Sequence, residues 1–191
     1  MPKMISQSAL QPGDIILSAA DGWIHHSSAA IRLATWSNLS HAALYVGGPE
    51  GYVVEAVGEG VRKLALCSAL ADDTVAIAYT RFGINPALAG SAVLFAMAQL
   101  GKAYNYAGAL AAGSSTPAGK VLRLATSGTS DAALAACSLY SSCASKTWFC
   151  AELVTAAYEW IAMPIIPKSA SQSTAALISE SHVLACLGQL K

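Results

Sequence analysis

Short apolar runs between turn residues predict the strands of this chain. The segment LQPGDIILS begins with a Pro-Gly turn and continues into a β-branched run, which predicts a buried strand over about 14–18. The segment SHAALYVGGPEGYVVEAV has two alternating runs around a loop with three glycines and a proline, a pattern typical of a hairpin. The run TVAIAYT predicts a further strand over 74–80.

Apolar residues at helical spacing predict the helices. We expect a short helix over 23–36, a packed internal helix over about 87–100 and a helix from about Cys150 to Met163. The last of these has a single apolar stripe formed by Cys150, Leu153, Val154, Ala157 and Ile161. The tail over 171–187, which follows two prolines, is weakly helical in pattern.

The order of these elements is mixed and does not alternate regularly, which favours an α+β fold, an antiparallel sheet packed against helices, over a doubly wound sheet. The length of 191 residues predicts one domain spanning 1–191. Between about 113 and 146 the composition shifts to Ser, Ala, Gly and Thr, which indicates an insertion with one short helix near 132–136. The alternative for this insertion is a plain surface loop.

Charge and hydropathy exclude several classes of partner. Eleven basic residues balance eleven acidic ones, so the sequence indicates neither nucleic acid nor an anionic membrane surface as a partner. The longest uncharged stretch, 82–101, is broken by Asn85, Pro86, three glycines and Gln99, so we expect no stable membrane insertion. The N-terminus lacks the pattern of a secretory signal peptide, and we therefore expect either another export route or a signal trimmed away.

Five cysteines leave at least one thiol unpaired. Cys137 and Cys143 are close enough in sequence to close a small disulfide in an oxidising compartment. No pair has the C-x-x-C spacing of a zinc or redox site, and the adjacent His25 and His26 have no ligand partners at helical spacing. We expect no metal and no cofactor.

The predicted hairpin brings a base and a carboxylate to one face. If its loop is centred near residue 48, His41 lies opposite Glu55, and a shift of one residue makes the two side chains diagonal neighbours. Either arrangement lets the carboxylate hold one imidazole nitrogen and leaves the other free to take a proton. Glu59 is a rival carboxylate, although it falls beyond the hairpin pairing. Taken singly, His41 is more often a satisfied core histidine and Glu55 a solvent-facing strand residue.

Cys150 supplies a nucleophile for this pair. It falls in the first turn of the predicted helix, where free backbone N–H groups and the helix dipole favour a thiolate. The alternative is a buried cysteine that acts as a small hydrophobic residue. A base, a carboxylate and a helix-start cysteine together favour Cys-His-acid catalysis over three unrelated structural roles.

Several short motifs resemble those of a known family. The runs LQPGDIIL, ATWSNLSHAALYVG, YVVEAV, GKAYNYAG and FCAELV are similar to those of the circularly permuted NlpC-type papain-like cysteine peptidases and amidases, the YiiX-like group. In this permuted group, as here, the histidine hairpin precedes the cysteine helix. The resemblance covers most of the chain and implies a permuted papain-like fold. It leaves out residues 113–146 and the C-terminal tail.

The resemblance also implies roles for individual residues. Cys150 matches the nucleophile, His41 the general base and Glu55 the orienting polar residue. Tyr104 in GKAYNYAG matches a tyrosine beside the nucleophile whose hydroxyl helps to stabilise the oxyanion; a packed aromatic with an exposed hydroxyl is the equal alternative. The long insertion between Tyr104 and Cys150 leaves open whether Tyr104 is placed as in relatives, or whether that segment forms a substrate lid instead.

These roles imply a cysteine hydrolase that cleaves amide bonds, and the family resemblance implies bacterial peptidoglycan stem peptides as its substrate. The missing signal peptide then predicts a toxin made in the bacterial cytoplasm and delivered, for instance by type VI secretion, to the periplasm of a target cell. Its partners would be the secretion machinery and an immunity protein. One alternative is a lipid-directed thiol acyltransferase or esterase of the same superfamily, and another is a non-catalytic binding module.

Overall fold

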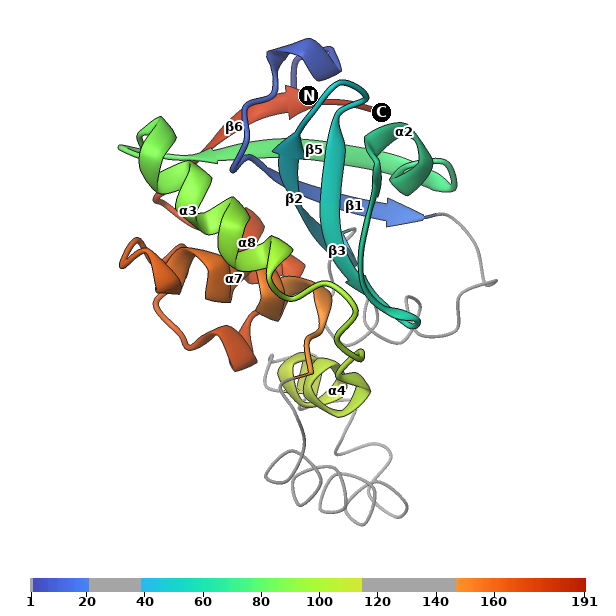
Figure 1. Ribbon diagram of the computed structural model, residues 1–191, viewed down its shortest axis with the longest axis vertical. Helices are drawn as coiled ribbons and strands as arrows, with labels where there is room; N and C mark the ends of the chain where they lie inside the picture. Colours follow the sequence, from blue (N-terminus) through green and yellow to red (C-terminus); the bar gives the residue numbers. More distant parts are fainter. Residues whose placement is uncertain (1, 21–38, 115–146) are drawn as a thin grey trace.

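The computed structural model describes residues 2–20, 39–114 and 147–191 (Figure 1). The described chain forms one six-stranded antiparallel sheet in the order β4-β3-β2-β1-β5-β6. Its strands are β1 (Ile15–Ala20), β2 (His41–Gly47), β3 (Tyr52–Val57), β4 (Gly60–Ala65), β5 (Asp73–Arg81) and β6 (Leu184–Gln189). The helices predicted at 23–36 and 132–136, and the Cys137–Cys143 pair, lie outside the described residues.

The described helices are mostly short. They are η1 (Gln7–Ala9), α2 (Leu66–Ala69), α3 (Pro86–Met97), α4 (Tyr106–Ser114), α7 (Cys150–Trp160), η2 (Ala170–Gln172) and α8 (Ala175–Ser179). Figure 1 shows α3, α7 and α8 gathered on one side of the sheet. The predicted α+β class is therefore confirmed. None of the helices in the described ranges is long and apolar enough to cross a membrane.

The sheet separates two apolar layers because alternate residues of each strand face opposite sides. On the helix side, Leu17, Leu44 and Val54 pack with α7 residues such as Leu153 and Val154. The other side forms a smaller cluster that includes Leu10, Ile16, Tyr45, Val53 and Ala78. The larger layer is thus the one that fixes α7 against β2 and β3.

The hairpin of β2 and β3 forms as predicted, with a different centre. Ala43 pairs with Glu55, and these two positions are equidistant from residue 49, one residue later than the loop centre near 48. Gly48 and Gly51 adopt positive φ angles of 94° and 65°, a conformation that glycine takes at little cost, and these angles let the chain reverse over the loop. His41 and Glu55 are therefore diagonal neighbours on one face. The prediction that they lie directly opposite each other, from a loop centred near residue 48, is wrong.

Helices α3 and α7 begin and end close to the predicted positions. Pro86 occupies the first turn of α3, and the Asn85 side chain accepts a hydrogen bond of 2.9 Å from the Leu88 N–H. Helix α7 ends at Trp160, three residues before the predicted end. Within it, the buried Tyr158 hydroxyl donates to the Gly13 carbonyl, which ties the helix to the turn before β1.

Both edge strands were missing from the sequence prediction. β4 carries two consecutive charged residues, Arg62 and Lys63, which hide its alternation. β6 lies in the tail that was predicted as weakly helical; only η2 and α8 there are helical. Pairing with β5, together with hydrogen bonds between Gln189 and the N-terminal residues Lys3 and Ile5, makes 184–189 a strand. Tertiary pairing overrides local preference here.

Candidate active site

His41 and Glu55 are held together by the hairpin. His41 is the first residue of β2, and its Nε2 lies 2.7 Å from Oε2 of Glu55 in β3. The Glu55 side chain is only 2% exposed, whereas that of His41 is 24% exposed. Because Nε2 is engaged by the carboxylate, Nδ1 is the ring nitrogen left for a second partner.

That second partner is Cys150, the first residue of α7. The Cys150 side chain is hydrogen-bonded to His41 and also interacts with backbone groups of Ala42 and Ala151. Cys150 is a free, buried cysteine. Helix α7 packs against β2 and β3, and its first residue contacts the first residue of β2. The structure thus brings Cys150, His41 and Glu55 into one connected cluster.

Glu152 fixes the start of α7. Its Oε2 accepts hydrogen bonds from the Phe149 backbone N–H at 3.3 Å and from Asn105 Nδ2 at 3.4 Å. A glutamate at this position of a helix that reaches back to the N-cap N–H satisfies one donor that the helix cannot satisfy itself. Glu152 therefore helps to position the first turn that carries Cys150.

The pKa values of the two partners move in opposite directions. Burial raises the pKa of the Cys150 thiol, but the hydrogen bond and positive charge of His41, with the backbone of Ala42 and Ala151, outweigh it and hold this pKa below its ordinary value. Burial lowers the pKa of His41, but its hydrogen bonds to Cys150 and Glu55 and their negative charges raise it well above its ordinary value. Both shifts favour a thiolate–imidazolium pair over a neutral thiol and a neutral imidazole.

This pair predicts a bell-shaped pH dependence of kcat/KM. The acid limb rises as pH passes the lowered pKa of Cys150, because the thiolate is the nucleophile. The alkaline limb falls as pH passes the raised pKa of His41, because the imidazolium supplies the proton to the leaving group. The two limbs report values that belong to the coupled pair. A single rise centred near about 8.5, as for an ordinary thiol, would contradict the ion pair.

Tyr104 lies beside the same cluster. It forms an isolated β-bridge with Trp148, two residues before Cys150, so the segments on either side of 115–146 meet here. Its ring packs edge-to-face on Tyr106 with centroids 4.7 Å apart. Burial, followed by the negative charge of Cys150, raises the pKa of the Tyr104 hydroxyl. Tyr104 is therefore a neutral phenol close to Cys150.

The remaining candidates lie elsewhere. Glu59 is in the turn after β3, where it is 80% exposed and pairs with Arg62 at 3.2 Å, so it does not compete with Glu55 for His41. Arg62 itself contacts Glu55, a contact that the sequence pattern does not predict because it does not predict β4. In the part of the chain that the structure describes, no group of three or more His, Cys, Asp or Glu residues could hold a metal ion.

Comparison with known proteins identifies the family. Residues 9–110, more than half of the chain, match the permuted papain-like amidase enzymes described as YaeF/YiiX, C92 family. The chain belongs to this family. The resemblance inferred from the sequence motifs is thereby confirmed, and the family supports a cysteine peptidase-like or amidase-like enzyme. The matched segment includes His41, Glu55 and Tyr104 but ends before Cys150. Cys150 is therefore assigned to the site by its contact with His41 in the structure and not by the family match.

A solved structure has the same fold. The crystal structure of the metalloprotein yiiX from Escherichia coli O157:H7 superposes with a TM-score of 0.65, at 18% sequence identity, over 94% of this chain and 97% of that one. At this identity the likeness establishes the permuted papain-like fold alone. The chain matches no curated protein sequence.

Proposed function

We propose that this protein is a cysteine amidohydrolase in which Cys150 is the nucleophile, His41 the general acid and base, and Glu55 the residue that orients His41. The observation that carries the proposal is the 2.7 Å contact between His41 Nε2 and Glu55 Oε2. Cys150, the first residue of α7, is hydrogen-bonded to the same imidazole. This is the nucleophile, base and orienting group arrangement of covalent acyl transfer.

In the acylation step, the Cys150 thiolate attacks the amide carbonyl carbon and forms a tetrahedral oxyanion. The backbone N–H of Cys150, in the first turn of α7, and the Tyr104 hydroxyl are the proposed donors to that oxyanion. The His41 imidazolium then gives the proton on Nδ1 to the amide nitrogen, the C–N bond breaks and the amine leaves. The product of this step is a thioester on Cys150 with a neutral His41.

In the deacylation step, His41 Nδ1 takes a proton from a water molecule as its oxygen attacks the thioester carbon. The C–S bond breaks, a carboxylic acid leaves, and the thiolate and imidazolium form again. Glu55 stays ionised in both steps. Burial raises the pKa of its carboxyl, but the hydrogen bonds and charges of His41 and Arg62 outweigh it and hold this pKa below its ordinary value.

The Tyr104→Phe variant tests the oxyanion role. Loss of the hydroxyl is expected to lower kcat about 10²-fold, because one donor to the oxyanion disappears. The rate at which iodoacetamide alkylates Cys150 should stay unchanged, because the thiolate does not need this donor. Tyr106→Phe is the matched control, since that exposed hydroxyl donates to the Gly58 carbonyl at 3.3 Å. Equal kcat in the Tyr104→Phe variant and the parent would leave Tyr104 as a packing residue.

We propose peptidoglycan stem peptides as the substrate, the class that the NlpC-type resemblance implies. The test is digestion of purified bacterial peptidoglycan with the parent protein and with Cys150→Ala, followed by mass spectrometry of the released muropeptides. Cleavage by the parent alone supports the proposal and identifies the scissile bond. Intact peptidoglycan in both digests contradicts this substrate.

The same two proteins separate the rival functions. Release of fatty acid from lipid esters by the parent, with intact peptidoglycan, would indicate the lipid-directed thiol acyltransferase or esterase. A Cys150 thiol that reacts no faster than an ordinary cysteine, with neither substrate consumed, would indicate a binding module in which the cluster only packs.

The similar protein yiiX is a metalloprotein. Among the described residues the acidic, histidine and cysteine side chains form no group of three or more that could hold a metal ion, and Glu55 already has His41 and Arg62 as partners. The proposed reaction uses the side chains of Cys150, His41 and Glu55.

Delivery by a type VI apparatus and an immunity partner stay predictions. Expression of the protein with and without an added periplasmic signal sequence tests the periplasmic target on which both predictions depend. Lysis that needs both the signal sequence and Cys150 is the expected result, and toxicity confined to the cytoplasm would contradict a periplasmic target.

A further inference from the structure

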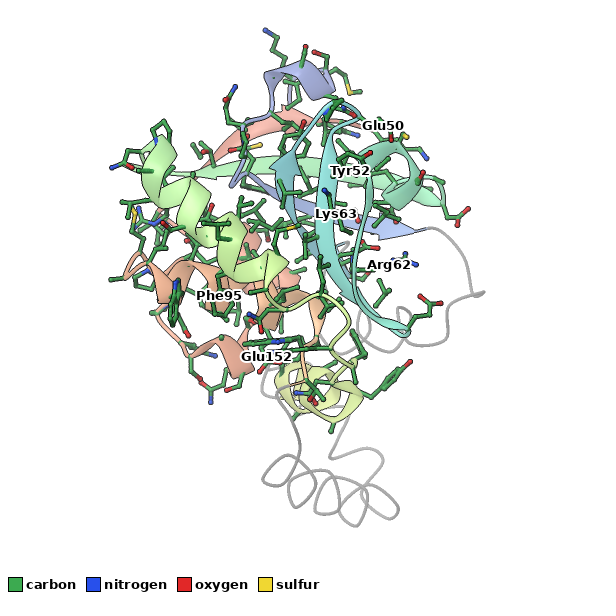
Figure 2. The ribbon with its side chains drawn as sticks, viewed as in Figure 1. Glu50, Tyr52, Arg62, Lys63, Phe95 and Glu152 are labelled. Atoms are coloured by element: carbon green, nitrogen blue, oxygen red, sulfur yellow. The ribbon has the colours of Figure 1, made fainter. Side chains whose placement is uncertain are left out.

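Arg62 extends the cluster beyond Glu55. In the register of β3 and β4, Arg62 pairs with Glu55, and Figure 2 shows Arg62 and Lys63 as successive side chains of β4. Both Nε and Nη2 of Arg62 lie 2.8 Å from Glu55 Oε1. The other oxygen of Glu55, Oε2, contacts His41. Each carboxylate oxygen of Glu55 is thus fixed by a different strand.

Because Glu55 is buried, its carboxylate needs a charged partner such as Arg62 to stay ionised. A carboxylate that is 2% exposed is costly to ionise without a charged partner. In the proposed reaction His41 becomes neutral when it gives up its proton, and it then no longer balances Glu55. The guanidinium of Arg62 keeps its charge at every step, and at 46% exposure it remains partly solvated.

We propose that Arg62 is a positioning residue of this site, which orients Glu55 toward His41 and balances its negative charge while His41 gains and loses a proton. The inference rests on the proposed function, because it takes Cys150 and His41 as the reacting pair. It goes further by assigning control of the protonation state of that pair to Arg62, an edge-strand residue whose hydrogen bonds and ion pairs go to Glu55 and Glu59.

The charged and titratable groups around the pair determine the sign of the expected effect. His41 faces Cys150 from α7 and Glu55 from β3, and Glu55 faces Arg62 from β4. Arg62 also contacts the exposed Glu59, while Tyr104 interacts electrostatically with Cys150, Tyr106 and Glu152. With Arg62, the buried thiolate, imidazolium and carboxylate are neutral as a set. Loss of its positive charge therefore favours proton uptake by every member of the cluster.

The test is the pH profile of Cys150 alkylation by iodoacetamide, followed site by site through peptide mapping, which needs no substrate. In Arg62→Met the acid limb is expected to move to higher pH, so that alkylation at the parent's half-point becomes about three- to tenfold slower. Arg62→Lys keeps the charge and should stay close to the parent. Lys63→Met is the matched control: it removes the same charge from the next residue, whose Nζ lies 4.4 Å from the Tyr52 ring centroid.

An acid limb in Arg62→Met that superposes on the parent profile would overturn the inference, and equal shifts in all three variants would do so as well. Should Arg62→Met not fold, Arg62→Gln, which keeps a donor for Glu55 without the charge, carries the same expectation. The parent profile separates this inference from the proposed function. An ordinary thiol profile in the parent would sink the function itself, whereas a low acid limb in the parent that Arg62 does not influence would sink only the role of Arg62.

Discussion

Replacement of Cys150 by serine is expected to lower kcat/KM by about 10³-fold or more, with the fold unchanged. A serine hydroxyl fits the space of the thiol, so the apolar packing of α7 on β2 and β3 remains. The cluster of His41 and Glu55 is arranged to stabilise a thiolate, and it cannot hold an ionised hydroxyl at neutral pH because the alcohol is a far weaker acid. The chemical step loses its nucleophile while the binding of substrate persists.

The measurement for Cys150→Ser is hydrolysis of the muropeptide identified by digestion, together with circular dichroism to verify the fold. Cys67→Ser is the matched control, because Cys67 is also a free cysteine but lies exposed on α2. The control is expected to keep the parent's kcat/KM. Activity of Cys150→Ser within about tenfold of the parent would remove Cys150 from the chemistry.

Replacement of Glu55 by glutamine is expected to lower kcat by about 10²- to 10³-fold. The amide has the shape of the carboxylate and still accepts from His41 Nε2–H, so the ring keeps its orientation. What disappears is the negative charge 2.7 Å from that ring. The raised pKa of His41 must then fall, and the alkaline limb of the pH profile moves to lower pH.

Two comparisons make the Glu55 prediction specific. Glu50→Gln changes an exposed carboxylate in the turn of the same hairpin, which accepts from the Tyr52 hydroxyl at 2.9 Å, and should leave both kcat and the alkaline limb in place. A Glu55→Gln variant with a lowered kcat and an unmoved alkaline limb would show that Glu55 acts through packing and not through its charge on His41.

The sequence predicts the centre of the fold and the central contacts of the site. Alternation over 41–46 and 52–57 places His41 and Glu55 on the same face, whichever residue centres the turn. The apolar stripe that begins at Cys150 predicts the buried face of α7 and its first residue. Both features are local, because they follow from the periodicity of a single element or of two adjacent strands.

The contacts that the sequence does not predict join distant segments. β6 becomes a strand only where β5 and the N-terminal segment supply hydrogen-bond partners. The bridge from Tyr104 to Trp148 depends on tertiary packing across the insertion. Arg62 is an intermediate case. It is separated from Glu55 by the turn at 58–59, so a second hairpin would have placed the two together, but two consecutive charges made β4 unrecognisable as a strand.

The most direct test of the central claim compares three cysteines in one protein. Cys150 is 6% exposed, whereas Cys67 and Cys186 are exposed, so accessibility alone would make Cys150 the slowest of the three to react. Peptide mapping after brief treatment with iodoacetamide at pH 6 measures all three rates in the folded parent. The proposed thiolate–imidazolium pair predicts that Cys150 is alkylated faster than both exposed thiols. Slower alkylation of Cys150 than of Cys67 and Cys186 would contradict the account.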